Sequence, residues 1–128
     1  MSATTMAPYP GAASERRRRG LLAELRAARL LQQAGFRILV RNYRCRGGEL
    51  DLVARRGRLL VIAEVRLRSS SAFGGAAHSI TAAKRRRLLF AARHLLARHP
   101  SLARLNVRFD ALLTRGASAP IEWLQAVM

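Results

Sequence analysis

The clearest pattern of apolar and polar positions lies in the stretch from Gly48 to Arg68, GELDLVARRGRLLVIAEVRLR. Its first part alternates between the two types, which is typical of a half-buried strand. The two faces of that strand are expected to carry Glu49, Asp51 and Val53 on one side, and Leu50, Leu52 and Ala54 on the other. The pair Arg56-Gly57 predicts a tight turn. A second strand then runs from Arg58 to Leu67, and its apolar residues on both faces indicate a central strand.

Two segments have the spacing of apolar residues that is typical of amphipathic helices. The first runs from Gly20 to Ala34, and Gly35 is expected to end it as the C-cap. The second runs from Ser79 to Arg98, and its apolar line consists of Leu88, Ala91 and Leu95. Lys84 precedes Leu88 by four residues on the same line, so the only lysine of the chain is expected to face inward.

Two further strands are expected, at Phe36–Val40 and Leu105–Leu113, and Asn42–Gly48 is expected to be a polar connection. The C-terminal segment Ile121–Met128 is expected to pack on the core through Trp123 as a short amphipathic end. The order helix, strand, strand, strand, helix, strand predicts a single α/β domain with a mixed β-sheet flanked by helices. Residues 1–14 are small, polar and proline-containing, so we expect a disordered tail followed by a domain at 15–128.

The composition adds a strong positive charge to this picture. Lys and Arg total 24 against 7 acidic residues, which gives a formal net charge of +17 over 128 residues. This balance favours polyanionic partners, with nucleic acid first and an anionic membrane second. All basic residues except Lys84 are arginines, a bias that also follows from a GC-rich genome. The residues expected to contact the phosphate backbone are Arg44, Arg46, Arg68 and Arg85.

The single cysteine and the absence of long apolar runs indicate in which cellular compartment the protein is expected. Cys45 alone excludes an internal disulfide and a cysteine-based zinc site, and it fits a reducing cytosol. No apolar run approaches the ~20 residues of a membrane span. The first 15 residues lack the apolar core of a signal peptide. We therefore expect a cytoplasmic protein with no membrane partner.

Three of the few acidic residues, Glu49, Asp51 and Glu64, fall within the predicted hairpin. Paired strands bring such side chains within several ångströms when register and face agree, and the carboxylates then repel one another. A divalent cation with oxygen ligands, Mg²⁺ or Mn²⁺, would neutralise them and could polarise a phosphodiester. The alternative for Glu49 and Asp51 is that they are solvated strand carboxylates paired with arginines.

The spacing of these acids resembles the PD-(D/E)xK signature of nucleases, in which an Asp is followed, a short hairpin later, by (D/E)-x-K. More narrowly, the chain resembles the YraN-type bacterial family of uncharacterised proteins, which has a restriction-endonuclease-like fold akin to archaeal Holliday-junction resolvases. The resemblance covers roughly residues 20–113. The motifs that carry it are AEL from Ala23, GFRILVRNYRCRGGELDLVA from Gly35, LLVIAEVRLR from Leu59, FGG from Phe73, ITAAKRRRL from Ile80 and VRFDALL from Val107.

The resemblance implies that Asp51 and Glu64 bind the metal, and that Glu24 and Glu49 are accessory acids near the same cleft. Glu24 falls at the edge of the apolar face of its helix, so it either reaches solvent or an arginine, or points into the site. Arg66 stands where the family normally has lysine. A guanidinium stays protonated and cannot act as a base.

Three outcomes therefore fit the residues. The site is metal-dependent but slow, with Arg66 stabilising negative charge; or Lys84 supplies the missing amine; or the protein only binds nucleic acid. The leading hypothesis is a Mg²⁺- or Mn²⁺-dependent DNA endonuclease that acts on branched or recombination DNA. The alternatives are a catalytically weak or inactive nucleic-acid-binding or scaffold module, and an assembly partner of another nucleic-acid machine. Junction enzymes of similar fold are often dimers, so the resemblance also allows a homodimer.

Overall fold

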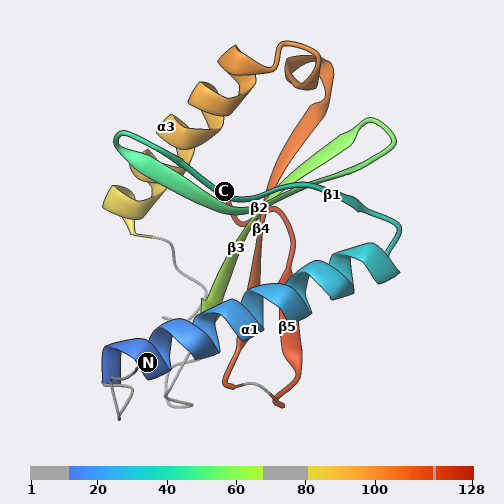
Figure 1. The fold of residues 1–128 in the computed structure, drawn as a ribbon. Coiled ribbons are helices and arrows are strands. Elements are labelled where there is room, and N and C mark those ends of the chain that lie inside the picture. The colour runs from blue at the N-terminus through green and yellow to red at the C-terminus, as the bar shows by residue number, and fades with distance from the viewer. Residues whose placement is uncertain (1–11, 68–80, 117) are drawn as a thin grey trace, which may run out of the picture.

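Two helices cover opposite faces of a five-stranded sheet in the computed structural model of the chain (Figure 1). The structure describes residues 12–67, 81–116 and 118–128. The elements are α1 (Ala12–Gln33), β1 (Arg37–Cys45), β2 (Gly48–Arg56), β3 (Leu59–Leu67), α3 (Ala82–Arg98), the 3₁₀ turn η2 (Leu102–Arg104), β4 (Asn106–Thr114) and β5 (Ile121–Leu124). The predicted single α/β domain with a mixed sheet flanked by helices is confirmed.

The strands lie in the order β1-β2-β3-β4-β5. The pairs β1–β2, β2–β3 and β4–β5 are antiparallel, whereas β3 and β4 are parallel because α3 lies between them in the chain. Since β3 and β2 lie inside the sheet and face a helix on each side, their apolar runs are buried. The inference that the second arm of the hairpin is a covered central strand is therefore confirmed.

Part of the C-terminal segment, which the sequence predicted only as a short amphipathic end, forms the strand β5. Ile121–Leu124 pairs with β4, while Trp123 packs on the α1-side core and lies edge-on to Phe36, as the sequence predicted for that side chain. Buried Asp110 on β4 accepts hydrogen bonds from the Trp123 indole at 2.9 Å and from the Ala126 amide at 3.0 Å. These bonds hold a short strand that has little apolar pattern of its own.

The first strand is longer than predicted, because β1 continues to Cys45 and turns directly into β2 at Gly48. The expected polar connection at Asn42–Gly48 is therefore wrong. As an edge strand, β1 has no fully buried residue and tolerates polar residues that hide the alternation. Gly47 permits the tight turn, since its φ of +98° is strained for any residue with a side chain.

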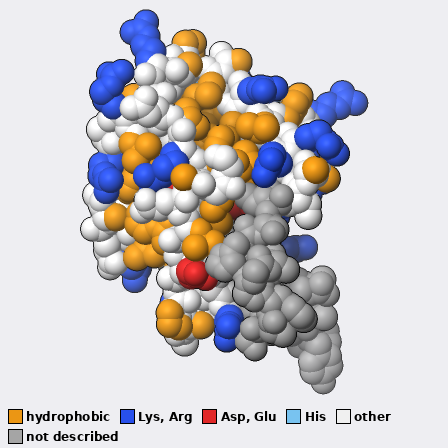
Figure 2. Space-filling view, turned by 180° about the vertical axis from the view of Figure 1, so that it is seen from behind, with side chains coloured by type: hydrophobic (Ala, Val, Ile, Leu, Met, Phe, Trp, Pro, Cys, Tyr) orange, Lys and Arg blue, Asp and Glu red, His pale blue; other side chains and the backbone are white. Residues whose placement is uncertain are grey.

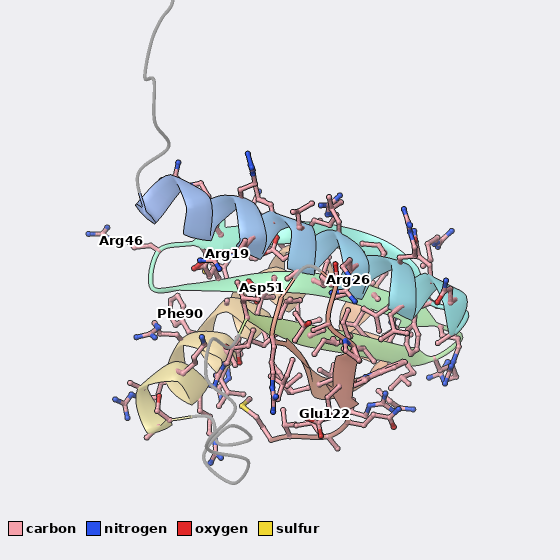
Figure 3. The ribbon with its side chains drawn as sticks, turned by 90° about the horizontal axis from the view of Figure 1, so that it is seen from below. Arg19, Arg26, Arg46, Asp51, Phe90 and Glu122 are labelled. Atoms are coloured by element: carbon pink, nitrogen blue, oxygen red, sulfur yellow. The ribbon has the colours of Figure 1, made fainter. Side chains whose placement is uncertain are left out.

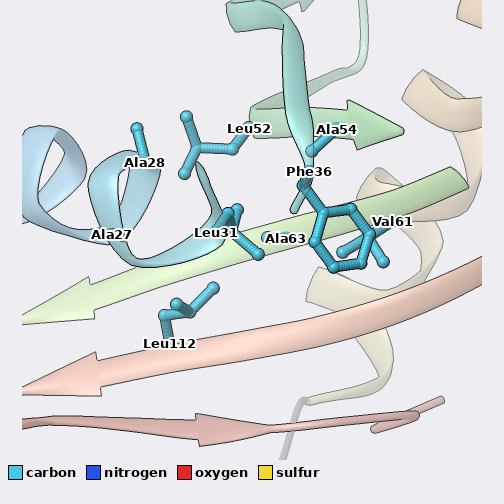
Figure 4. Close-up of a cluster of buried hydrophobic side chains, with 9 residues drawn as sticks. All are labelled: Ala27, Ala28, Leu31, Phe36, Leu52, Ala54, Val61, Ala63 and Leu112. Atoms are coloured by element: carbon cyan, nitrogen blue, oxygen red, sulfur yellow. The ribbon is translucent and has the colours of Figure 1, made fainter. Parts of the chain in front are cut away.

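Two hydrophobic clusters fasten the helices to the sheet. On one face, small and aliphatic residues of α1 pack on β2, β3 and β4 (Figure 4). On the other face, α3 packs through Leu88, Ala91, Ala92 and Leu95, which agrees with its predicted apolar line. The α3-side cluster also receives Leu60 and Ile62 of β3. Glu64, two residues further along the same strand face, is thereby directed toward α3.

The alternation predicted for residues 49–54 breaks at Asp51. Leu52 and Ala54 pack on the α1 side, but Leu50 packs with Val53 on the α3 side. The irregularity coincides with two local features: Asn42, a neighbour of Asp51 across the hairpin, has a φ of +55°, and the β2–β3 register ends at Leu52 and Ala63. The proposed common face of Leu50, Leu52 and Ala54 was therefore wrong.

The helix boundaries follow local capping chemistry. α1 begins at Ala12 rather than at the predicted Gly20, and Gly35, with a φ of +92°, ends it as predicted. The Thr81 hydroxyl caps α3 by accepting the Lys84 amide at 3.1 Å. In the described residues, neither helix combines the length and the hydropathy that a membrane span requires.

Candidate functional site

A cleft of about 510 Å³ lies where the β1–β2 turn, β3 and the first turns of α3 meet. Its lining combines acidic and basic side chains: Arg44, Cys45, Gly48, Glu49, Asp51, Glu64, Lys84, Arg87 and Leu88. Figure 3 shows Asp51 on the hairpin, with Arg46 and Phe90 nearer to its turn. The structure thus brings together five residues that the sequence selected, namely Arg44, Glu49, Asp51, Glu64 and Lys84.

Asp51 reaches β3 through its side chain instead of through the strand register. The sequence had suggested that Asp51 and Glu64 face each other across paired strands. The last paired residues of β2 and β3 are Leu52 and Ala63, so both acids lie just beyond the paired region. Beyond this point the Asp51 carboxylate accepts the Val65 amide at 2.8 Å. This bond satisfies a backbone donor that the interrupted ladder leaves open, and it fixes Asp51 beside the residue that follows Glu64.

Burial makes the negative charge of Asp51 costly. Desolvation raises its pKa to about 6, the Val65 hydrogen bond opposes the rise, and the neighbouring charges of Glu24, Glu64 and Glu49 add to it. A pKa in this range means that Asp51 is ionised near pH 7 but has little electrostatic compensation. A cation bound beside it would relieve this cost.

Glu64 is the most buried acid in the cleft, with 5% of its surface exposed. Its Oε2 atom pairs with the Lys84 ammonium and, at 3.1 Å, with the Arg66 guanidinium. Its Oε1 atom is buried and has no hydrogen-bond partner within the part of the chain that the structure describes. One oxygen is therefore held by two cations, and the other retains its capacity to accept a ligand.

Lys84 occupies the inward position that its spacing from Leu88 predicted. Its side chain crosses from the first turn of α3 to Glu64 and remains 39% exposed. Arg66 lies on the same face of β3 as Glu64, since the two side chains bond at a separation of two residues. The amine and the guanidinium thus meet at one carboxylate oxygen.

The two predicted accessory acids occupy different positions. Glu49 lines the cleft but is exposed, and it pairs with Arg44 at 3.7 Å. Glu24, on α1, does not line the cleft, although its charge is near enough to raise the pKa of Asp51. Burial raises the pKa of Glu24 itself, and a hydrogen bond with the Asn42 side chain opposes the rise. Glu24 therefore acts on Asp51 electrostatically from outside the cleft lining.

The predicted phosphate-contacting arginines are dispersed. Arg44 lines the cleft, whereas Arg46 at the turn and Arg85 on α3 are exposed and outside its lining. Arg68 falls outside the described residues. Sequence reasoning missed Arg87, which lines the cleft three residues after Lys84, a spacing that places both on neighbouring positions of one helix. Basic side chains spread over the face shown in Figure 2 and do not form one patch there.

The donor set of the cleft fits a hard divalent cation. Asp51 and Glu64 offer carboxylate oxygens, and Mg²⁺ in proteins commonly binds one or two carboxylates together with water and substrate phosphate. Across residues 12–67, 81–116 and 118–128, no group of three or more His, Cys, Asp or Glu side chains is arranged to hold a metal. A metal here would therefore depend on these two acids and on oxygens from the substrate.

Comparison with known proteins gives a consistent result. The model of the uncharacterised protein family UPF0102 matches residues 23–114. Three similar proteins, each called a UPF0102 protein, illustrate the match. The chain is 52% identical over 124 residues to that of Paracidovorax citrulli, which covers 91% of this chain and 89% of the other. The protein of Dechloromonas aromatica is 50% identical over 107 residues, with 84% and 85% covered. That of Xanthomonas euvesicatoria is 46% identical over 110 residues, with 86% and 90% covered.

Proposed function

The chain belongs to the uncharacterised protein family UPF0102, and we propose that it is a nucleic-acid-binding protein with a divalent-metal-dependent phosphodiesterase site that acts on DNA. One observation carries the proposal. Two buried or half-buried carboxylates, Asp51 and Glu64, share a cleft with Lys84 and Arg87 in a chain of net charge +17. A polyanionic substrate would be attracted to the protein as a whole, and the acids would require a cation where the phosphate arrives.

Asp51 and the free Oε1 atom of Glu64 would hold the metal, Mg²⁺ or Mn²⁺. When bound, such an ion supplies a Lewis acid for the phosphodiester and lowers the pKa of a coordinated water. The protein's own contribution is positional. The Val65 amide fixes one oxygen of Asp51, and Lys84 and Arg66 fix one oxygen of Glu64. The remaining oxygens stay oriented without a loss of side-chain freedom on binding.

Arg66 and Lys84, the two cations at Glu64, would together replace the single lysine of the (D/E)-x-K signature. Arg66 stays protonated, so it can bind a phosphate oxygen and stabilise developing negative charge but cannot accept a proton. Lys84 has an amine that can exchange its proton, and it reaches the cleft from α3. We therefore assign charge stabilisation to Arg66 and the orientation of the attacking water to Lys84.

The proposal includes a restriction-endonuclease-like core. Its support is the order α1-β1-β2-β3-α3-β4, with Asp51 near the start of β2 and Glu64-Val65-Arg66 late in β3. The choice of branched or recombination DNA as substrate rests on the resemblance to junction resolvases, because a fold alone does not set a substrate.

A second candidate is a nucleic-acid-binding module without efficient cleavage. One observation favours it: Glu64 already pairs with both Lys84 and Arg66, so its charge is neutralised without a metal. In that case the cleft is a structural ion cluster at the base of a basic surface, and the arginines alone contact phosphate.

Binding and cleavage assays on one set of substrates separate the two candidates. Purified protein is incubated with linear, single-stranded and four-way-junction DNA, with Mn²⁺ or with EDTA, beside Asp51→Asn and Glu64→Gln. The nuclease proposal requires Mn²⁺-dependent cleavage that both variants lose. The binding module is supported if the affinity for DNA rises as the salt concentration falls and neither wild type nor Arg66→Lys cleaves any substrate. Absence of binding to every substrate contradicts both candidates.

A further inference from the structure

An exposed aromatic ring stands beside the cleft. Phe90 on α3 is 51% exposed, although the residues that follow it, Ala91 and Ala92, are buried in the α3-side core. Single exposed apolar side chains are normal on a protein surface and need no function. The position of Phe90 relative to the cleft and to the arginines gives it more significance.

The Phe90 ring packs against the β1–β2 turn. A Cβ atom added at Gly47 would lie 3.2 Å from Cε2 of Phe90, so the glycine lets one edge of the ring approach the turn. At Gly48 an added Cβ would lie 2.3 Å from the Arg87 carbonyl oxygen, which shows how closely α3 approaches the start of β2. Gly48 itself lines the cleft. The ring therefore packs against the turn at Gly47, next to Gly48 of the cleft lining.

Positive charge surrounds the ring on its own helix. Arg86 and Arg87 precede Phe90 by four and three residues, and Arg93 follows it by three, so all three are its neighbours on the helix surface. Arg86 and Arg93 are exposed, and Arg87 lines the cleft. An apolar ring flanked by cations matches one ligand closely: a nucleotide, whose base has an aromatic face and whose phosphate is an anion.

We propose that Phe90 is a stacking platform for an unpaired base of the nucleic acid whose backbone enters the cleft. The inference rests on the proposed function and specifies its substrate. In a duplex each base is stacked on its neighbours, so only an unpaired base can offer its face to a protein ring. The site selects nucleic acid with a single-stranded stretch, such as an open arm, next to the phosphate that reaches Asp51 and Glu64.

The test compares single-stranded and fully paired DNA of the same sequence, each carrying 2-aminopurine, at two salt concentrations. Phe90→Ala should weaken single-strand binding by roughly five- to 100-fold, as expected for one stacked base, and change duplex binding less than about twofold. The dependence on salt should stay the same, because no phosphate contact is removed. The change in 2-aminopurine fluorescence on binding should also be lost.

Two further variants guard against a merely structural effect. Phe90→Tyr retains the ring and should bind single strands like wild type, and Val107→Ala, which trims another exposed apolar residue, should leave both affinities unchanged. Equal effects of Phe90→Ala on single strands and duplex, or no effect on either, overturn the inference and leave the proposed function intact. If wild type binds neither DNA, the proposed function fails and the inference fails with it.

Discussion

The Asp51 carboxylate accepts the Val65 amide at 2.8 Å where the β2–β3 ladder ends. This bond connects the first acid of the cleft to the strand that carries the second. It holds a poorly solvated carboxylate close to Glu64 in the folded protein, and an energetic cost follows. A cation bound in the cleft would relieve that cost.

Replacing Asp51 with Asn should stabilise the metal-free protein near neutral pH. Burial raises the pKa of Asp51 from 3.8 to about 6 in the folded state, so folding favours the protonated form. The penalty is absent below the unfolded pKa, grows as pH rises from 3.8 to about 6, and is complete above that. At about 1.4 kcal/mol per pKa unit, the expected gain at pH 7.5 is about 2–3 kcal/mol.

Urea unfolding in EDTA at pH 7.5 and pH 4 measures this effect. Asn can still accept the Val65 amide, so the change removes the charge and keeps the bond. Glu122→Gln is the control, since it removes an exposed acid on β5. A gain that is the same at both pH values would mean that the charge of Asp51 is not penalised.

The Lys84 ammonium should stabilise Glu64 in the absence of metal. Lys84→Met keeps most of the length of the side chain, removes the ammonium, and leaves the contact between Arg66 and the buried Glu64 carboxylate in place. Removing one partner of a buried pair is costly, and the partial exposure of Lys84 lowers the cost to about 1–2 kcal/mol. Thermal and urea unfolding of Lys84→Met, Glu64→Gln and the double variant give the coupling directly. Additive effects would show that the contact contributes nothing.

Restoring a lysine at position 66 should increase cleavage. Arg66→Lys introduces an amine that can exchange a proton beside Glu64, and proton transfer by a positioned group contributes about 10²–10⁴-fold in enzymes. We expect at least about a tenfold faster Mn²⁺-dependent rate, measured on end-labelled DNA under single-turnover conditions. The double variant Arg66→Lys, Asp51→Asn is the control and should be inactive. A rate unchanged in Arg66→Lys would indicate that Lys84 already fulfils this role.

Gly48 should be needed for the close approach of α3 to β2. Gly48→Ala places a methyl group against the Arg87 carbonyl, a backbone atom that cannot rotate away. We expect the free energy of unfolding to fall by about 1–3 kcal/mol, because overpacking displaces α3 and with it the cleft residues that α3 carries. Gly20→Ala is the matched comparison. It adds the same methyl group within α1, where nothing lies within 4 Å, and should stabilise by about 0.5–1 kcal/mol. Equal unfolding midpoints for the two variants would contradict this difference.

Local pattern was enough to predict the parts of the site that follow strict periodicity. Lys84 could be placed inward because Leu88 lies one turn away. The hairpin turn was predicted from Gly57 to within one residue: the sequence placed it at Arg56-Gly57, and the structure places it at Gly57-Arg58. These features depend on residues within a few positions of one another.

What the sequence concealed depends on contacts between distant segments. The extension of β1 was missed because an edge strand has no need to alternate, and β5 because Asp110 holds it through tertiary hydrogen bonds. The break at Asp51 coincides with the end of the β2–β3 pairing, which no local pattern reports. Arg87 was overlooked within a run of basic residues, although its spacing from Lys84 was available.

The central claim is that Asp51 and Glu64 together bind a divalent cation, and Mn²⁺ binding observed by electron paramagnetic resonance tests it most directly. Protein in metal-free buffer at pH 7.5 is titrated with Mn²⁺, and free ion is read from the signal, for wild type, Asp51→Asn, Glu64→Gln and Glu122→Gln. The account predicts one ion per chain for wild type and Glu122→Gln, at least a tenfold loss of affinity in the other two variants, and weaker binding below pH 6 as Asp51 is protonated. Equal binding by all four proteins, or no binding by wild type, would contradict it.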